Sequence, residues 1–397
     1  MVVLAVACFI AGPLPTIHAS QFSQAVDDRL VENAAEVYVD PAQAKRRGGL
    51  ELAAMLSFAY DDNIFLSKEK PKSDMVFRAG PSIGYSHGDP GEGVGAFVRL
   101  AYRPTAVVYA DTKSENRVDH QAEFTAGWRG QASKITYSGA IQKLGDATAD
   151  TGRQTDRLEY QHELRAAWLP RERISLELAA GQRESNYSDE KLYDSHKVYG
   201  EAVIRYFYSP KTELAIAYQV GRFQVEGSDN QNFQQLTGSI AWKPREKITV
   251  HLQAGAERRQ TAAGTDINPV IEGRIDWKPR EGTSLSLTGY QRQEASAYLA
   301  GQNYELKGFS VGISQRLGSR WTARLDAGRE LVSYRDVSGT GDDGRRDKIW
   351  FVRPALEYKF TDAVDVSLFY RMSRNRSNSQ DFGYDQNIAG IELNYRF

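Results

Sequence analysis

Hydrophobic and polar residues alternate along most of this chain, from Leu50 to the C-terminus. In ITVHLQAGA at 248–256, apolar residues hold every even position, while polar residues and a glycine hold the odd ones. In NIAGIELNYRF at 387–397, apolar residues hold the odd positions from Ala389 to Phe397. Because successive side chains of a β-strand point to opposite faces, this period of two predicts strands with one apolar and one polar face.

Such segments recur about 18 times, and most are about 10–14 residues long, which suits tilted strands that cross a bilayer. They cover residues 50–60, 74–86, 94–110, 119–129, 134–144, 156–168, 174–186, 196–208, 213–225, 233–242, 248–259, 269–277, 283–294, 304–316, 321–334, 349–360, 364–375 and 387–397. A soluble propeller is the main alternative, but a propeller blade fits four short strands into about 40–45 residues, whereas here a similar length holds two long strands.

The connections between these segments alternate in length. Short turns such as SPKT at 209–212 and TDA at 361–363 alternate with longer polar stretches, GSDNQN at 227–232, TAAGTDIN at 261–268 and DVSGTGDDGRRDK at 336–348. Short periplasmic turns and long external loops are typical of bacterial outer-membrane barrels. The sequence therefore predicts an all-β fold, a transmembrane antiparallel up-and-down β-barrel over 49–397 with about 18 strands (16–18 are compatible), and both termini in the periplasm.

Aromatic residues mark one end of the predicted strands. AWLPRERISL at 167–176, AWKPREKITV at 241–250 and DWKPREGTSL at 276–285 each place a Trp before a Pro and a charged corner. Amphipathic rings favour the membrane–water interface, so aromatics at one height predict an interfacial girdle. Its predicted members are Trp128, Trp168, Tyr208, Trp242, Trp277, Trp321, Phe360 and Phe397.

The first 48 residues lack this alternation. Residues 1–19 are uncharged and mostly apolar and end in Ile17-His18-Ala19, which predicts a secretory signal peptide. A transmembrane helix is the alternative, but the run is too short and contains Gly12, Pro13 and Pro15. Residues 20–48 are polar with a weak helical pattern, and we interpret them as a periplasmic lead-in, with a short helix as one option.

Composition and motifs argue against several classes of function. The net charge of -1 excludes an excess of Lys and Arg, so no nucleic acid is expected as a partner. Cys8 is the single cysteine and lies in the predicted signal peptide, and the histidines show no metal-ligand spacing. We find no nucleophile elbow and no phosphate loop, and we interpret Asp342 and Asp343 as part of a loop rather than a calcium site. The sequence thus predicts no enzyme, no cofactor and no metal site.

Charged residues gather on the polar face of the predicted strands. Near the membrane midplane they would be costly in lipid, so they are expected to face the lumen. The predicted pore-lining residues are Arg78, Arg99, Arg103, Arg129, Glu163, Arg165, Arg205, Glu272, Arg274, Arg324, Asp326, Arg353 and Arg371. Two interpretations stay open: the charges pair and fill the barrel, or they line a channel for polar, including anionic, sugar chains, with Phe97, Phe351 and Phe369 stacking on sugar rings.

Two short stretches carry a family resemblance. GIELNYRF, which ends at Phe397, resembles the C-terminal signal by which the barrel-assembly machinery recognises outer-membrane barrels. AYDDNIF at 59–65 resembles the opening of a family of bacterial outer-membrane β-barrel porins (EpsL-like proteins), some of which accompany exopolysaccharide or capsule export.

This resemblance implies a channel that exports an exopolysaccharide or capsular polysaccharide. Its implied partners are outer-membrane lipids, the assembly machinery and a periplasmic polysaccharide export protein. Two alternatives remain: a general or substrate-specific uptake porin for small polar solutes, and a structural or adhesive surface barrel with a closed lumen.

Overall fold

A computed structural model describes residues 49–397 apart from 92, 149, 152–153, 300–301 and 337–343. The predicted signal peptide (1–19), the predicted lead-in (20–48), and Asp342 and Asp343 lie outside the described residues. None of the helices within the described ranges is long and apolar enough to cross a membrane.

The described chain folds into 18 strands and two short 3₁₀ helices, η1 (Lys113–Glu115) and η2 (Gln380–Phe382). The strands are β1 (Gly49–Asp61), β2 (Asp74–His87), β3 (Gly95–Tyr109), β4 (Arg117–Arg129), β5 (Ser133–Leu144), β6 (Arg157–Arg171), β7 (Ile174–Tyr187), β8 (Ser195–Ser209), β9 (Thr212–Val225), β10 (Gln231–Arg245), β11 (Ile248–Thr261), β12 (Gly264–Trp277), β13 (Thr283–Ala295), β14 (Gln302–Leu317), β15 (Trp321–Asp336), β16 (Arg346–Lys359), β17 (Val364–Ser377) and β18 (Tyr384–Arg396).

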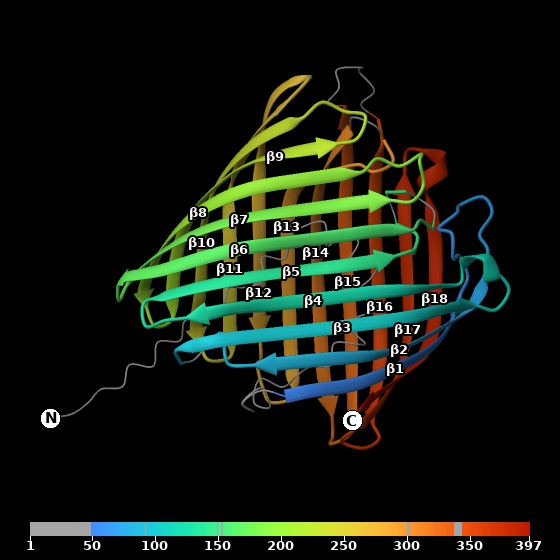
Figure 1. The fold of residues 1–397 in the computed structure, drawn as a ribbon. Helices are drawn as coiled ribbons and strands as arrows, with labels where there is room; N and C mark the ends of the chain where they lie inside the picture. Colours follow the sequence, from blue (N-terminus) through green and yellow to red (C-terminus); the bar gives the residue numbers. More distant parts are fainter. Residues whose placement is uncertain (1–48, 92, 149, 152–153, 300–301, 337–343) are drawn as a thin grey trace.

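These strands form one closed antiparallel barrel. Each strand pairs with its neighbours in sequence, and β1 pairs with β18 in a register that runs from Ala53 opposite Arg396 to Asp61 opposite Ile388. In Figure 1 the strands of the near wall run across those of the far wall, as expected for strands tilted around a barrel axis. The predicted fold class, an up-and-down barrel of about 18 strands, is confirmed.

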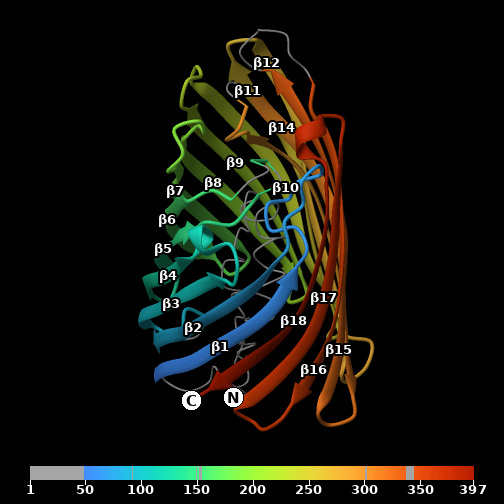
Figure 2. The same ribbon diagram turned by 90° about the vertical axis from the view of Figure 1, so that its right-hand side faces the viewer.

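The two ends of the barrel differ. The end that holds Phe397 carries mainly two- to five-residue connections, and we call it the turn end; the opposite end, with connections such as 62–73 and 145–156, is the loop end. Figure 2 shows the loop end at the top and the C-terminus at the bottom. One predicted loop, 261–268, is wrong. Only Ala262 and Ala263 separate β11 from β12, because these polar residues extend a hairpin rather than interrupt it.

Aromatic residues lie at the turn end as predicted, although two of their strands run further than expected. Strands β6 and β10 continue past Trp168 and Trp242, and their pairing shifts register before Arg171 and Arg245. Pro170 and Pro244 lie inside these irregularities, where no ladder hydrogen bond is required. The rings of all eight predicted girdle residues are exposed. Their role at a membrane interface stays a prediction.

The barrel wall has an apolar outer face and a polar inner face. On β9, Ile216 is 62% exposed and Tyr218 is 45% exposed, whereas Gln219 on the other face is buried and lines an internal cavity. A soluble protein would bury the apolar face, so this inversion requires an apolar surrounding.

On the inner face of the barrel, aromatic residues lie opposite glycines on the neighbouring strand. Phe97 pairs with Gly127, Phe351 with Gly328, and Phe369 with Gly390, and a Cβ on any of these glycines would lie within 3 Å of the paired ring. The rings therefore lie against the wall over the glycines. Phe97 and Phe351 are buried, which leaves little of their rings for the sugar stacking suggested from the sequence.

Candidate functional site: the lumen

Ion pairs between residues i and i+2 recur along the inner wall. Glu163 Oε1 lies 2.9 Å from Arg165 Nε, Glu257 Oε1 lies 2.7 Å from Arg259 Nε, and Arg292 Nε lies 3.2 Å from Glu294 Oε1. Residues two apart share one face of a strand, so each pair neutralises itself locally on the inner face. The spacing of two residues is visible in the sequence, where the charged residues share the polar face of the predicted strands.

A larger network crosses strands near the turn end. The Arg165 guanidinium contacts Glu163 on its own strand, Glu177 on β7 at 3.1 Å and Glu201 on β8 at 2.9 Å. Arg205 Nε lies 2.8 Å from Glu177, and Arg205 also pairs with Glu213 on β9. These charge-assisted contacts tie four neighbouring strands together and line one side of a cavity, the turn-end chamber, which also includes Arg129 and Arg274.

The other predicted pore-lining residues lie elsewhere on the inner face. Arg78, Arg103 and Arg371 line a second cavity, the side chamber, which is enclosed mainly by β1–β4, β17 and β18. Arg324 pairs with Glu357 at 2.8 Å. Asp326 is opposite Arg353 in the β15–β16 register, and the Arg353 guanidinium lies 5.0 Å from the centre of the Phe369 ring.

Two predicted residues stand apart from these clusters. Arg99 is exposed and lies on the same face of β3 as Arg103, outside the three cavities described here. Glu272 lines both the turn-end chamber and a third cavity toward the loop end, and it forms no ion pair with the described residues. The structure thus distributes the predicted residues over several chambers rather than one ring. Their part in solute passage stays a prediction.

The described residues of the connection between β5 and β6, 145–148, 150–151 and 154–156, reach across the lumen; we call them the crossing loop. At one side, Gln154 Nε2 donates to the carbonyl oxygen of Ile64 at 3.2 Å and to Tyr109 Oη at 3.0 Å. At the other, the Asp150 carboxylate accepts hydrogen bonds from Ser296 Oγ at 2.9 Å, Ala297 N at 2.8 Å and Tyr334 Oη at 2.8 Å.

These contacts join opposite sides of the ring. Strands β5 and β6 lie nine places from β14 and β15 in the strand order, so Asp150 fixes the crossing loop to the far wall. Arg345, just before β16, strengthens the attachment by donating from Nη1 to the carbonyl oxygen of Asp150 at 2.9 Å. We call this set of contacts to Asp150 the latch.

Other loops meet at the latch. Tyr193 N, between β7 and β8, donates to the carbonyl oxygen of Ala297 at 2.8 Å. The Arg345 guanidinium lies 3.5 Å from the centre of the Phe382 ring in η2, and Tyr298 meets the same ring edge-on. Connections from four parts of the chain therefore converge over the loop end of the lumen.

The crossing loop separates two cavities. Thr148 and Asp150 line the cavity toward β6–β16, the loop-end chamber, whereas Asp146, Ala147 and Gln154 line the side chamber. The lumen at this level is thus two narrower compartments rather than one wide bore.

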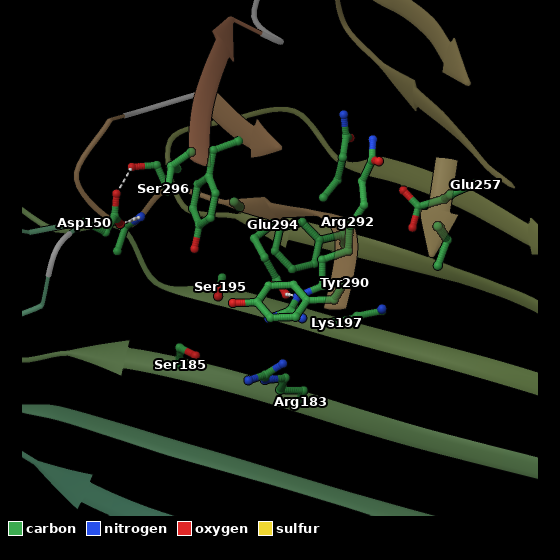
Figure 3. Close-up of a pocket in the computed structure, with 18 of the residues that line it drawn as sticks. Asp150, Arg183, Ser185, Ser195, Lys197, Glu257, Tyr290, Arg292, Glu294 and Ser296 are labelled. Atoms are coloured by element: carbon green, nitrogen blue, oxygen red, sulfur yellow. Dashed lines mark hydrogen bonds and ion pairs between the residues drawn. The ribbon is translucent and has the colours of Figure 1, made fainter. Parts of the chain in front are cut away.

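The loop-end chamber is acidic and rich in tyrosine. Among the described residues that line it are seven carboxylates and three cations, Arg183, Lys197 and Arg292. Four of the carboxylates, Glu163, Glu201, Glu257 and Asp347, pair with arginines behind the lining. The Lys197 ammonium lies 4.5 Å from the centre of the Phe233 ring, and Tyr290 donates a hydrogen bond to Glu330. Figure 3 shows Glu257, Glu294 and Arg292 around Tyr290 and Lys197, with Asp150 and Ser296 joined at the edge. Carboxylates and phenol groups together suit hydroxyl groups or a cation better than an anion.

Sequence reasoning missed the latch and this chamber. Asp150 lies in a polar connection of ordinary appearance, and nothing in its neighbourhood indicates a partner on the opposite wall. Glu330 lies on the polar parity predicted to face the lumen, and Tyr290 could have been found in the same way, because it lies on the polar parity of the predicted strand 283–294.

The C-terminal third of the chain resembles a known protein family. Residues 265–397 match the model of the family described as Putative beta-barrel porin 2. No curated protein matches the chain.

Solved structures of two bacterial proteins have a similar fold. Acinetobacter baumannii OccAB2 is 12% identical, with 88% of this chain and 98% of that chain covered and a TM-score of 0.50. The outer membrane protein opdK from Pseudomonas aeruginosa is 13% identical, with 88% and 98% covered and a TM-score of 0.48. At these identities the likeness shows the fold alone.

The family match covers part of the barrel, from β12 to the C-terminus. The described chain has the fold of a closed 18-stranded antiparallel β-barrel with an apolar outer face. The family match agrees with the predicted porin-type barrel.

Proposed function

We propose that this barrel is a selective channel for small, hydroxyl-rich solutes that are neutral or cationic, with its turn end and both termini in the periplasm. One observation carries the proposal: the crossing loop divides the lumen and is latched to the opposite wall by Asp150. A barrel of this strand number has room for a wide aqueous channel, so a loop held across it is a selectivity element.

The lining of the chambers supports the choice of solute. A solute that enters from the loop end meets an excess of carboxylates together with tyrosine hydroxyl groups, which disfavours anions. Toward the turn end it meets the Arg165 and Arg205 network, whose cations are already paired with Glu177, Glu201 and Glu213. Paired charges leave a polar, nearly neutral wall over which a sugar-like molecule can exchange hydrogen bonds.

Releasing the latch tests the proposal. Asp150→Ala removes a charged acceptor whose hydrogen bonds each contribute about 1.5–3 kcal/mol, so the crossing loop should leave the far wall. We expect a larger single-channel conductance in planar bilayers and faster swelling of proteoliposomes in large sugars.

Asp229→Ala is the matched control, because Asp229 is exposed in the β9–β10 connection and has the same charge. It should leave conductance unchanged. Equal conductance in the wild type and Asp150→Ala would show that the crossing loop does not limit passage, and the proposal would fail. If neither conducts, the barrel is closed and the structural or adhesive alternative is correct.

Export of an exopolysaccharide or capsular polysaccharide is the second candidate. It is favoured by the latch itself, since a polymer channel must stay shut until engaged, and Asp150 makes four hydrogen bonds that hold the described part of the crossing loop to the far wall. The porin resemblance at AYDDNIF implies the same role, together with a periplasmic polysaccharide export protein and recognition of the Phe397 end by the assembly machinery. A deletion strain that secretes normal polysaccharide but loses uptake of a small sugar would exclude export.

A further inference from the structure

The barrel wall is incompletely paired between β12 and β13. Strand β12 pairs with β11 along its whole length, from Gly264 to Trp277, but it pairs with β13 only from Ile271 to Trp277. Strand β13 meanwhile pairs with β14 as far as Ala295. Residues 264–270 and 292–295 therefore face each other across an unpaired stretch, which we call the seam.

Pro269 gives a local reason for the seam. The register between β11 and β12 is unbroken through Pro269, which lies opposite Ala256. Because proline has no N–H, its nitrogen must face away from this ladder, toward β13. Continuing the β12–β13 register would place Pro269 opposite Gln293, where a donor is missing. A proline in mid-strand thus ends the pairing where the seam begins.

The loop-end chamber reaches into the seam. On its other strands, this chamber is lined by residues of the inward parity, such as Arg183, Lys197 and Tyr304. On β12 and β13 it is lined by consecutive residues of both parities, Val270 to Glu272 and Tyr290 to Ala295. The cavity therefore extends between these two strands toward the outer face of the barrel.

The two sides of the seam differ in polarity. The outward residues of β12 are apolar from Ile267 to Ile271, and Ile267 is 73% exposed and Ile271 is 47% exposed. The outward residues of β13 at this level, Gln291 and Gln293, are polar. The inner side carries Glu272, Arg292 and Glu294. A polar group in the chamber and a hydrocarbon chain on the outer face of β12 would both find matching surroundings.

We propose that the seam is a lateral opening through which an amphiphile, a molecule with a polar head and a hydrocarbon chain, passes between the loop-end chamber and the membrane. The head would contact the carboxylates of the chamber, and the chain would lie over Ile267, Pro269 and Ile271. This inference rests on the proposed channel function, because it needs a chamber that a solute can enter.

Sealing the seam tests the inference. Ile267→Cys and Ala295→Cys, which face each other in the continued register, are joined by a bifunctional thiol reagent; the only natural cysteine is Cys8, in the predicted signal peptide. Ile275→Cys with Leu287→Cys is the matched control, because these residues already pair. The probe is dodecyl maltoside with a photoreactive group on its alkyl chain, and labelled peptides are mapped by mass spectrometry against the peptide that contains Ile216.

In the wild type and in the cross-linked control we expect labelling concentrated at 264–271 and 290–295. In the sealed variant it should fall by about tenfold, which corresponds to about 1.4 kcal/mol of binding. Pro269→Val, which restores the missing donor, should reduce labelling in the same direction without any reagent.

Three outcomes would overturn the inference: labelling spread evenly around the outer face, labelling unchanged by the seal, or a seam occupied by a second copy of the chain in native mass spectrometry. Potassium conductance is measured on the same samples. If the wild type does not conduct potassium, the proposed channel is contradicted. If it conducts but the seam is not labelled, only the lateral opening is contradicted.

Discussion

At the scale of single residues, the inner wall depends on close pairs whose members are ordinary in isolation. An aromatic ring lies over the glycine opposite it, as with Phe351 and Gly328, and a carboxylate lies beside the arginine two residues away, as with Glu163 and Arg165. In both kinds of pair, each residue contributes to stability through its contact with the other. Single substitutions should therefore be costly where the partner cannot move.

Gly328→Ala tests the aromatic pairs. Its Cβ would lie 2.5 Å from Cε1 of Phe351 and 3.0 Å from the carbonyl oxygen of Phe309, so the ring must leave its place on the wall. We expect a loss of about 1–3 kcal/mol of unfolding free energy, measured by urea titration in liposomes. Gly289→Ala, whose nearest contact would be 3.8 Å away, should be nearly neutral. Equal effects of both substitutions would contradict the packing argument.

At the scale of elements, each strand is defined by its two faces and each connection by what it touches. The alternation of β9 or β15 was sufficient to predict those strands, because face and period are local properties. The hairpin at Ala262 was missed because polarity was taken as a loop signal, whereas the polar residues at this end continue both strands. The crossing loop and the seam were unpredictable, since they depend on Asp150 reaching a distant wall and on where pairing stops.

A charge placed on either face of one hairpin tests the inside–outside assignment. Ile216→Arg, on the apolar outer face of β9, should cost about 2–4 kcal/mol at the membrane midplane. Gln235→Arg, on the inner face of the neighbouring strand β10, adds the same guanidinium beside the chamber carboxylates and should cost far less. Heat-modifiable mobility on gels reports the folded fraction of each variant. A larger loss for Gln235→Arg would invert the assignment.

At the scale of the whole molecule, charge varies along the lumen although the chain is almost neutral. The chain's formal charge of -1 conceals a loop-end chamber with a surplus of carboxylates and a turn-end chamber with paired arginines. Net composition therefore gave no indication of ion preference. A channel with an acidic entrance should favour cations.

Reversal potentials in a potassium chloride gradient measure that preference. The wild type should favour potassium over chloride, and Glu272→Lys, which inverts a charge with no ion pair among the described residues, should lower the permeability ratio by about two- to fivefold. Glu246→Lys, in the exposed turn between β10 and β11, makes the same charge change outside the lumen and should leave the ratio unaltered. A chloride-selective wild type would contradict the acidic entrance.

The contact between the first and last strands has a consequence for how the protein is made. Gln386 Nε2 donates to the Asp61 carboxylate across 325 residues of sequence, and the ladder between β1 and β18 forms only when both are present. The ribosome synthesises β1 long before β18. The backbone groups of β1 that pair with β18 therefore stay without this partner until the rest of the chain has been made. A chain truncated before β18 retains two open strand edges, however well its other hairpins pair, and becomes a substrate for aggregation or degradation.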